Sequence, residues 1–570
     1  MDTTTISGYR SEFVVMSEPN AVRKIIECAN RREVLKMTGG VAGLTSVAGC
    51  LGGGGDGDHG ELVPELDLLL PQFLSFDDHG RQISTQWENS LGIRIDYEVI
   101  DWNTYLDRVF SEPFDYPHMA HASYAGTPER IDPEFIFSTL VSDSVQNKSF
   151  YENSEYDEVY NEYLQAFDDE EKNQAIEKLQ NIILEDVPII EYFRSPTANP
   201  TNTADWDIEP TQLLGSGAAA TQTHLLAEPT GDESMLVIGW DGRYNQPNPM
   251  NVISGPIWAF FGNVFDTFRR VDTDGSYINW AVDSFEVIDN RTIDLTLRDG
   301  MTFHDGEDVT SEDLAFTLNM HRDYSFPKYA IFGDYLEEAT TQTDTTVRVT
   351  FEEPYAPFLT GGAVSFKIVP EHIWRDVLDS DDPVNYQMDD SEAIGSGPFQ
   401  VVELSDEELV LEAFDDHWMS PEYDELRVVS QDSLEGIRSN IVAGNIDMVS
   451  QEISPEVAQR TADESDGLEM LSESGLQWSC IVLDNTIYPT RDRPFRRALQ
   501  KSLDPQVLKD SIYEGTGDIA TGALVHPTRD LGRNVSPMSF NVEEARNILS
   551  EAGYTWDSND RLHYPLDYDI

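Results

Sequence analysis

The chain has 570 residues and a formal net charge of −68, with 105 acidic against 37 basic residues, which excludes a protein that binds nucleic acid through a basic face. Hydrophobic residues at 39% and aromatic residues at 10% are enough for two or three folded domains and exclude a disordered chain. The basic residues are 28 Arg and only 9 Lys. A chain so rich in acids and poor in Lys resembles proteins from organisms that live with molar salt, which screens the repulsion between the acids beyond roughly 3 Å.

The beginning of the chain predicts an export signal. Arg31 and Arg32 precede a mildly apolar run at 37–49, which is shorter than the ~20 residues that a membrane-spanning helix needs. A pair of arginines before such a run is typical of the twin-arginine export route. We therefore expect an export signal at 1–49. The alternative is a chance pair of arginines before a glycine-rich loop.

The sequence Ser-Val-Ala-Gly-Cys ends this signal and resembles a lipobox. In a lipobox, small residues precede the cleavage point and the thiol that follows, here that of Cys50, carries the lipid. The glycine-rich stretch 50–63 is predicted to be a flexible tether. The exported protein would then be anchored on the outer face of the cytoplasmic membrane, at the cell surface.

Strand and helix patterns alternate along the rest of the chain, as in α/β or α+β domains. One helix is predicted over Asp168–Asp186, and a second follows Asn541, with Glu544 at the capping-box position and Gly553 at the C′ site. The acidic segment Ala227–Ser234 is predicted to be a linker. Strands are predicted at Met235–Gly239, Thr292–Leu297, Thr346–Phe351, Glu408–Ala413, Ile446–Ser450 and Cys480–Leu483.

The segment 299–313 combines turn and helix signals. Two Asp-Gly dipeptides, at 299–300 and 305–306, bracket a short strand, and Thr310 is placed to cap a helix with Asp313 three residues on. His304 stands beside an aspartate and could belong to a metal or acid–base pair. A histidine in a turn is the simpler interpretation.

Three blocks at 280–287, 295–306 and 309–314 together resemble the signature of the family 5 extracellular solute-binding proteins, the oligopeptide- and dipeptide-binding lipoproteins of ABC importers. Further pieces of the same pattern follow in the family's order at 368–372, 395–399, 444–447, 495–504 and 545–554. Any one of these pieces is weak, but their succession is specific.

The resemblance implies a fold and a function. The fold would be a two-lobed α/β (α+β) clamp of the periplasmic-binding-protein type with an inserted sub-domain. The protein would be a monomer without enzymatic activity or cofactor. It would capture peptides between its lobes and deliver them to the permease subunits of an ABC transporter in the membrane. The resemblance to lipoproteins and the acidic composition together suggest a halophilic archaeon as the source.

The order of the family pattern is altered. Segments that resemble the family's last third lie near the beginning of the chain. These are a strand at 66–70, a helix at 82–91, a strand at 91–95, a loop at 131–134, and a helix and strand at 168–190. A circular permutation would explain this order. The alternative is a truncated family member with an unrelated domain in front.

The permuted order makes one geometric prediction, that Leu69 and Leu566 lie close together. It also divides the chain into five parts. Besides the signal and the tether, we expect one lobe from 64–193 with 477–570, a main lobe from 194–264 with 394–476, and an inserted sub-domain at 265–393.

The resemblance also implies ligand contacts at the junction of the lobes. Asp132 is the candidate partner of a peptide's α-amino group. For the aromatic candidates, a plain core role is equally compatible with the sequence. The remaining candidates are Trp240, Tyr244, Asn245, Trp258, Phe261, Trp478, Asn485 and Tyr124. No metal site is predicted.

Other functions remain open at this point. The solute could be a sugar or a nickel complex instead of a peptide. A secreted hydrolase is a weaker alternative, because no Gly-x-Ser-x-Gly, His-Glu-x-x-His or P-loop motif occurs and Cys480 lies in an apolar strand. A surface-layer or adhesion protein would predict repeats, which the sequence lacks. Asn147, Asn290 and Asn534 lie in glycosylation sequons.

Overall fold

The computed structural model describes residues 59–72, 76–110, 114–116, 118–240, 248–250, 260–324, 326, 330–389, 391–405, 407–450, 453–526, 531 and 539–568. All of them belong to one compact unit, which runs from Gly57 to Ile570. The expected signal residues Arg31, Arg32 and Cys50 lie outside the described residues. Within the described ranges, no helix combines the length and apolar character needed to cross a membrane.

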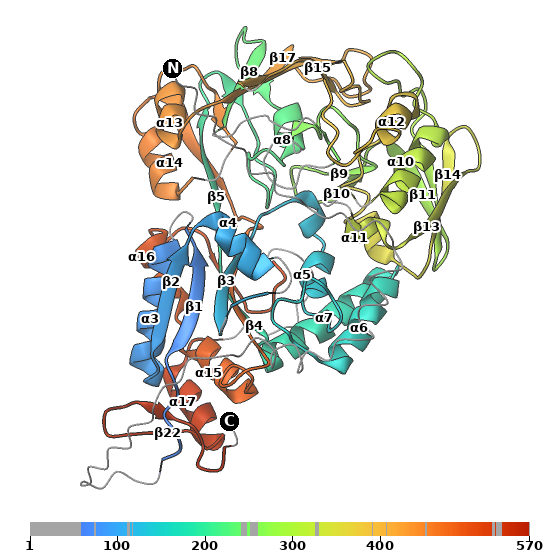
Figure 1. The fold of residues 1–570 in the computed structure, drawn as a ribbon. Helices are drawn as coiled ribbons and strands as arrows, with labels where there is room; N and C mark the ends of the chain where they lie inside the picture. Colours follow the sequence, from blue (N-terminus) through green and yellow to red (C-terminus); the bar gives the residue numbers. More distant parts are fainter. Residues whose placement is uncertain are drawn as a thin grey trace, which may run out of the picture. The chain divides into compact units, whose positions relative to one another are not determined.

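The first sheet is built from β1 (Leu66–Pro71), β2 (Ile95–Ile100), β3 (Met119–Tyr124), β4 (Ile189–Arg194), β20 (Trp478–Leu483) and β21 (Asp518–Ile519). Its order is β2-β1-β3-β20-β4-β21, and Figure 1 labels β2, β1, β3 and β4 of this sheet. β1 runs parallel to both of its neighbours, whereas β20 runs antiparallel to β3 and to β4. All residues of β4 and β20 are buried, so the centre of this sheet is covered on both faces.

Two groups of helices cover this sheet. One face packs against α3 (Phe76–Leu91), α15 (Arg493–Ser502), α16 (Pro505–Ile512) and α17 (Val542–Glu551), and the other packs against α6 (Ser154–Gln165) and α7 (Asp169–Asp186). The alternation along β1 shows the division: Leu68 and Leu70 join the first core and Leu69 joins the second, because successive side chains of a strand point to opposite faces. Short helical turns complete the second side: α4 (Trp102–Tyr105), η1 (Leu106–Phe110), η2 (Pro128–Arg130) and α5 (Glu134–Ser138).

The second sheet is built from β5 (Thr197–Asn202), β8 (Met235–Trp240), β15 (Phe399–Leu404), β16 (Glu408–Ala413), β17 (Glu425–Ser430), β18 (Met448–Val449) and β19 (Leu468–Glu473). Its order is β15-β16-β17-β8-β18-β5-β19. Three helices accompany it: α8 (Thr221–Leu225), α13 (Leu434–Val442) and α14 (Pro455–Ala462). A two-stranded ladder of β6 (Trp206–Asp207) and β7 (Glu228–Pro229) precedes β8.

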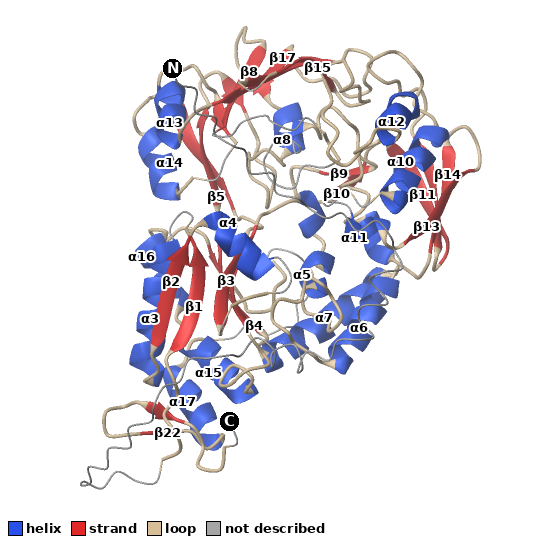
Figure 2. Ribbon diagram, in the orientation of Figure 1, coloured by secondary structure: helices blue, strands red, loops and turns tan. Residues whose placement is uncertain are grey.

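A separate antiparallel sheet lies in the chain between β8 and β15. It contains β11 (Val282–Asp289), β12 (Thr292–Leu297), β13 (Leu336–Thr341) and β14 (Thr346–Phe351), in the order β11-β12-β14-β13. The helix α10 (Ser311–Asp323) packs on β13 and β14 of this sheet (Figure 2). The neighbouring elements are β9 (Arg269–Val271), β10 (Tyr277–Asn279), α11 (Ala330–Gly333), η3 (Ala356–Leu359) and α12 (Glu371–Leu378). Near the end of the chain, β22 (Thr555–Trp556) pairs with β23 (Leu562–His563).

The two large sheets are joined by two crossing segments, from β4 to β5 and from β19 to β20. These segments lie against each other: the Ser195 N–H donates to the Gln477 carbonyl at 3.1 Å. A Cβ on Gly475 would lie 1.9 Å from the carbonyl oxygen of Ser195, so only glycine fits there. The close contact fixes the place where the chain passes from one sheet to the other.

Most expected elements occur where the sequence placed them. The capping box of Thr310 and Asp313 is present, and Asp168 and Asn541 cap α7 and α17 through their side chains. Gly553 follows α17 with a φ of +91°, as a C′ glycine should. The expected strand at 91–95 was wrong, because the residues after Gly92 stay irregular until β2 begins at Ile95.

Candidate ligand-binding site

A cavity of about 210 Å³ lies where the chain crosses between the two large sheets. This volume is below that of a site that encloses a whole drug-sized ligand, so the cavity has room for part of a solute. Its walls come from five short segments of the chain. They contribute Ala125 and Gly126 after β3, Ser195 to Asn199 at one crossing, Leu213, Leu214 and Gly217 to Ala219 before α8, Ser450 after β18, and Leu476 and Gln477 at the other crossing.

Hydrogen bonds between these segments hold the cavity together. The Leu476 N–H donates to the Leu213 carbonyl at 2.9 Å, next to the bond between Ser195 and Gln477. The Gln477 side-chain amide lies 3.3 Å from the Ser123 hydroxyl. The walls are therefore tied to both sheets, and a change in the angle between the sheets would change the shape of the cavity.

Tyr124 and Trp478 form a stacked pair beside the cavity. Tyr124 ends β3 and Trp478 begins β20, and they are direct cross-strand partners. Their ring centroids are 4.5 Å apart with an interplanar angle of 19°, a stacked geometry that favours aromatic contact. Burial raises the pKa of Tyr124. Each has a sequence neighbour in the cavity walls: Ala125 follows Tyr124, and Gln477 precedes Trp478.

Asp132, the candidate partner of a ligand amine, is buried and already has partners. Its carboxylate accepts hydrogen bonds from Lys172 and Thr360, each at 2.6 Å, and from Tyr163. Burial alone would raise its pKa, but the Lys172 ammonium and these hydrogen bonds keep the pKa below its ordinary value. A ligand amine would have to displace Lys172 from this carboxylate.

The structure separates the other candidates from the cavity walls. Trp240 and Phe261 are buried members of one core cluster. The Asn485 amide donates to the carbonyls of Ser149, Pro188 and Leu483 at 2.9–3.1 Å, and so fixes main chain. Three further candidates lie outside the described residues: Tyr244, Asn245 and Trp258.

The residues that line the cavity carry no chemical motif, and this is why the sequence did not single them out. They are mostly small or neutral, such as the Ala218 and Ala219 pair that follows Gly217. A signal was available in the run Gly-Ser-Gly-Ala-Ala-Ala at 215–220, since so many small residues in sequence permit close approach of other chain segments.

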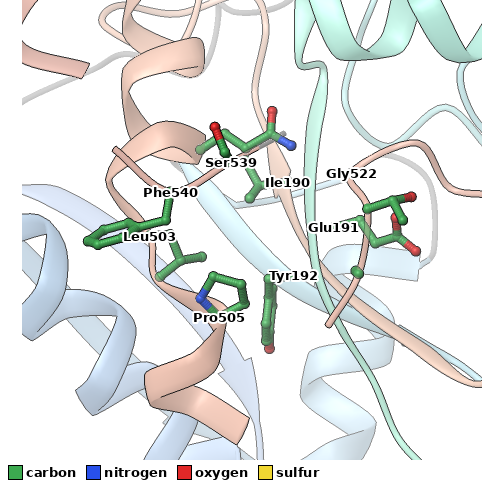
Figure 3. Close-up of a pocket in the computed structure, with 11 residues that line it drawn as sticks. Ile190, Glu191, Tyr192, Leu503, Pro505, Gly522, Ser539 and Phe540 are labelled. Atoms are coloured by element: carbon green, nitrogen blue, oxygen red, sulfur yellow. The ribbon is translucent and has the colours of Figure 1, made fainter. Parts of the chain in front are cut away.

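A second hollow lies between β4 and the chain that leads to α16 and α17. Its lining includes Ile190, Tyr192, Leu503 and Phe540, and Figure 3 shows Glu191 and Gly522 together on the side away from Phe540 and Leu503. Its volume of about 30 Å³ is the space of roughly one water molecule. This hollow is too small for a solute, so the cavity at the crossing is the better candidate site.

Titratable groups elsewhere have structural partners. His304 receives the Gly395 N–H at Nδ1 and lies 3.0 Å from the Gly397 carbonyl at Nε2, and burial lowers its pKa to about 4. It therefore acts as the turn histidine that the sequence suggested. Burial raises the pKa of the Cys480 thiol, which disfavours the reactive thiolate. The described residues contain no cluster of three acidic, His or Cys side chains suited to a metal ion.

Two β-sheets joined by crossing segments, with a cavity at the crossing, define a two-lobed α/β protein of the binding type. Residues 276–568, just over half of the chain, match the family model described as "Bacterial extracellular solute-binding proteins, family 5 Middle". The chain belongs to family 5 of the extracellular solute-binding proteins, as the sequence resemblance predicted.

Curated relatives match the chain over about half of its length. Protein XP55 of Streptomyces lividans is 30% identical over 271 residues, which are 47% of this chain and 47% of that protein. The oligopeptide-binding protein AppA of Bacillus subtilis is 24% identical over 279 residues, 47% of this chain and 50% of AppA. The dipeptide-binding protein of Escherichia coli is 24% identical over 288 residues, 46% and 52% of the two chains. The chain thus spans about half the length of the curated relatives it matches.

Solved structures also resemble the chain. AppA of Bacillus subtilis in complex with a nonapeptide has a TM-score of 0.44 and 20% identity, over 57% of this chain and 66% of that chain. NikA of Brucella suis in complex with Fe(III)-EDTA has a TM-score of 0.47 and 18% identity, over 57% and 65%.

Proposed function

We propose that this protein is the solute-binding component of an ABC importer, which captures peptides between two lobes and delivers them to membrane permease subunits. The observation that carries the proposal is the cavity at the crossing of the two sheets in a chain of this family. Binding there would couple solute capture to the angle between the lobes, because the cavity walls belong to both. A non-enzymatic monomer without cofactor is sufficient for this role.

Peptide is the proposed solute because two relatives are named as binders of oligopeptides and dipeptides. Other relatives are named as binders of heme and nickel, so a different solute is the main alternative. A secreted hydrolase is a weaker alternative. Burial raises the pKa of the Cys480 thiol, and the His304 ring is held by the main chain of Gly397.

The proposed ligand contacts are the cavity walls and the groups around them. Tyr124 and Trp478 support the walls from the first sheet. For Trp240 and Phe261, which are core residues outside the cavity walls, we propose an indirect role through packing. The three candidates outside the described residues remain proposed contacts from the other lobe. Asn485 would contribute indirectly, because its side-chain amide fixes the main chain by hydrogen bonds. Asp132 would contribute only if a ligand amine replaced Lys172.

A thermal-shift screen in molar KCl tests the proposed solute. Di- to pentapeptides should raise the melting midpoint of the protein, because a ligand that binds only the folded state stabilises it. Neutral oligosaccharides and nickel–histidine complexes serve as the competing classes. Stabilisation by one of those classes alone would contradict peptide binding, and cleavage of a peptide during the assay would favour a hydrolase.

We also propose that the protein is exported through Arg31 and Arg32 and anchored by a lipid on Cys50, at the surface of a halophilic archaeon. The order of signal, small residues and cysteine supports this. In the native host, Cys50→Ser should move the protein from the membrane fraction to the medium. Retention of the variant on the membrane would contradict lipid attachment at this residue.

We further propose that the chain is circularly permuted. The first sheet supports this, because β1 to β4 precede the family match at 276–568 whereas β20 and β21 lie inside it. In addition, the Val63 N–H donates to the Leu562 carbonyl at 2.9 Å, and the Tyr564 N–H donates to the Glu61 carbonyl at 2.8 Å. The part before β1 is therefore paired with the part after β22, as neighbouring ends of a permuted chain would be.

The permutation implies the lobe boundaries given above: 64–193 with 477–570, 194–264 with 394–476, and 265–393. A gene with the order 231–568 followed by 60–230 tests it and keeps the β6–β7 ladder. The rearranged protein should fold with the same melting midpoint to within a few degrees, because only loop connections change. Failure to fold would favour an unrelated domain in front of a truncated family member.

A further inference from the structure

We propose that the cavity at the crossing takes an uncharged segment of the solute, so that the charged ends of a bound peptide lie outside it. This inference rests on the proposed function and specifies which part of a peptide the site recognises. It follows from the chemistry of the walls, the pairing of the charges around them, the size of the cavity and its place in the sheet.

The cavity walls carry no charge among the described residues. None of the fifteen lining side chains is acidic or basic, although charged residues make up 25% of the chain. The polar lining groups are neutral hydroxyls and amides, as in Ser195, Thr197 and Gln477. Such groups and the main chain can hydrogen-bond a neutral amide. They cannot neutralise an ammonium or carboxylate group, whose unpaired burial is costly.

Three charged side chains near the cavity are engaged by the protein itself. The Arg130 guanidinium donates to the carbonyl of the lining residue Ala125 at 2.7 Å. Arg194 directly precedes the lining residue Ser195, but it is buried and forms an ion pair with the buried Glu191. Asp132 is paired with Lys172 at 2.6 Å and is not part of the walls. A peptide terminus in the cavity would therefore meet no available counter-charge on these residues.

The size and position of the cavity favour a short stretch of extended main chain. Its volume of about 210 Å³ is below the ~300–1,000 Å³ typical of sites that enclose a whole drug-sized ligand. β18 pairs with β5 only through Met448 and Thr201, and the cavity begins where this pairing stops, between Ser450 and the start of β5. An extended peptide can occupy such a place by strand-like hydrogen bonding.

Gly217 provides a direct test of charge in the cavity. A Cβ at this position would have only the carbonyl oxygens of Ser450 at 3.5 Å and Leu214 at 3.8 Å within 4 Å, which is ordinary contact. Asn and Asp side chains have the same shape, so Gly217→Asn measures the effect of size and Gly217→Asp adds charge. The melting midpoints of both variants without peptide show whether they remain folded.

The binding experiment uses pentaalanine with free ends and N-acetyl-pentaalanine amide, titrated by calorimetry in molar KCl. The proposal predicts that the wild-type protein binds the two peptides with dissociation constants within about threefold. It also predicts that Gly217→Asp binds both peptides at least tenfold more weakly than Gly217→Asn.

Two results would overturn the inference while leaving peptide capture intact. One is a blocked peptide that binds the wild-type protein at least tenfold more weakly than the free peptide. The other is a free peptide that binds Gly217→Asp more tightly than Gly217→Asn, because the added carboxylate would then attract an ammonium group inside the cavity. If neither peptide binds the wild-type protein, the proposed peptide function falls together with this inference.

Discussion

At the scale of single residues, Glu134 shows how burial controls ionisation in this acidic protein. It lies 3% exposed, and its carboxyl accepts a hydrogen bond from the Tyr160 hydroxyl at 2.8 Å. Burial raises its pKa to about 7, against 4.5 for an ordinary glutamate. Charged and titratable neighbours are Asp132, Lys172, Tyr335 and Tyr355.

Glu134→Gln should make the protein more stable at pH 8 and leave its stability at pH 4 nearly unchanged. Between pH 4.5 and 7 the folded state holds a proton on Glu134 that the unfolded state has lost, so the contribution of this group to stability falls as the pH rises through that window. The expected gain at pH 8 is about 1–3 kcal/mol in the free energy of unfolding. Denaturant titrations at the two pH values measure it, and an equal effect at both would contradict the raised pKa.

At the scale of elements, the contact between the Asp132 loop and η3 joins segments that are distant in sequence. The Thr360 hydroxyl follows η3 and donates to the Asp132 carboxylate, which α7 also contacts through Lys172. In Figure 1, α6 and α7 lie on the side of the sheet formed by β11 to β14, and α6 contacts η3. Asp132 thus helps to hold the first lobe against the part of the chain that contains η3.

Thr360→Val should lower the free energy of unfolding by about 1–3 kcal/mol, because it removes a hydrogen bond to a buried, charged carboxylate. Thr360→Ser keeps the hydroxyl and is the matched control, with an expected loss below about 1 kcal/mol. Chemical denaturation measures both changes. If valine and serine destabilised equally, the hydroxyl would have no part in this contact.

Elements with local signals could be predicted from the sequence. The strands β12, β14 and β16 match their expected bounds, because the residue patterns and turns that define them are local. β18 is shorter than the predicted Ile446–Ser450, since its length depends on pairing with β8 and β5. The cavity could not be predicted, because its walls come from segments up to hundreds of residues apart that share no motif. Asp132 was singled out, but no pattern showed that Lys172, 40 residues on, would pair with it.

At the scale of the whole molecule, the charge of −68 determines the conditions in which the fold is stable. Half-buried arginines pair with acids, as in Arg546 with Asp560 and Arg291 with Glu337, but 37 basic residues cannot neutralise 105 acidic ones. The excess negative charge repels itself in the compact state, and salt reduces this repulsion.

The melting midpoint should therefore rise by about 10 °C or more between 0.1 M and 2 M KCl. Scanning calorimetry at constant pH measures the change, with an equal concentration of sucrose as the control for changes that are not ionic. A midpoint that is independent of KCl would contradict the interpretation of the acidic surface as an adaptation to salt.

The central claim is that this protein captures peptides where its chain crosses between the two large sheets. Calorimetric titration of the chain with pentaalanine in 2 M KCl, followed by mass spectrometry of the peptide, tests it most directly. We predict one binding site per chain, an affinity at least tenfold weaker for Gly217→Asp than for Gly217→Asn, and recovery of the peptide uncleaved. Absence of binding heat, or an affinity unaffected by Gly217→Asp, would contradict the claim.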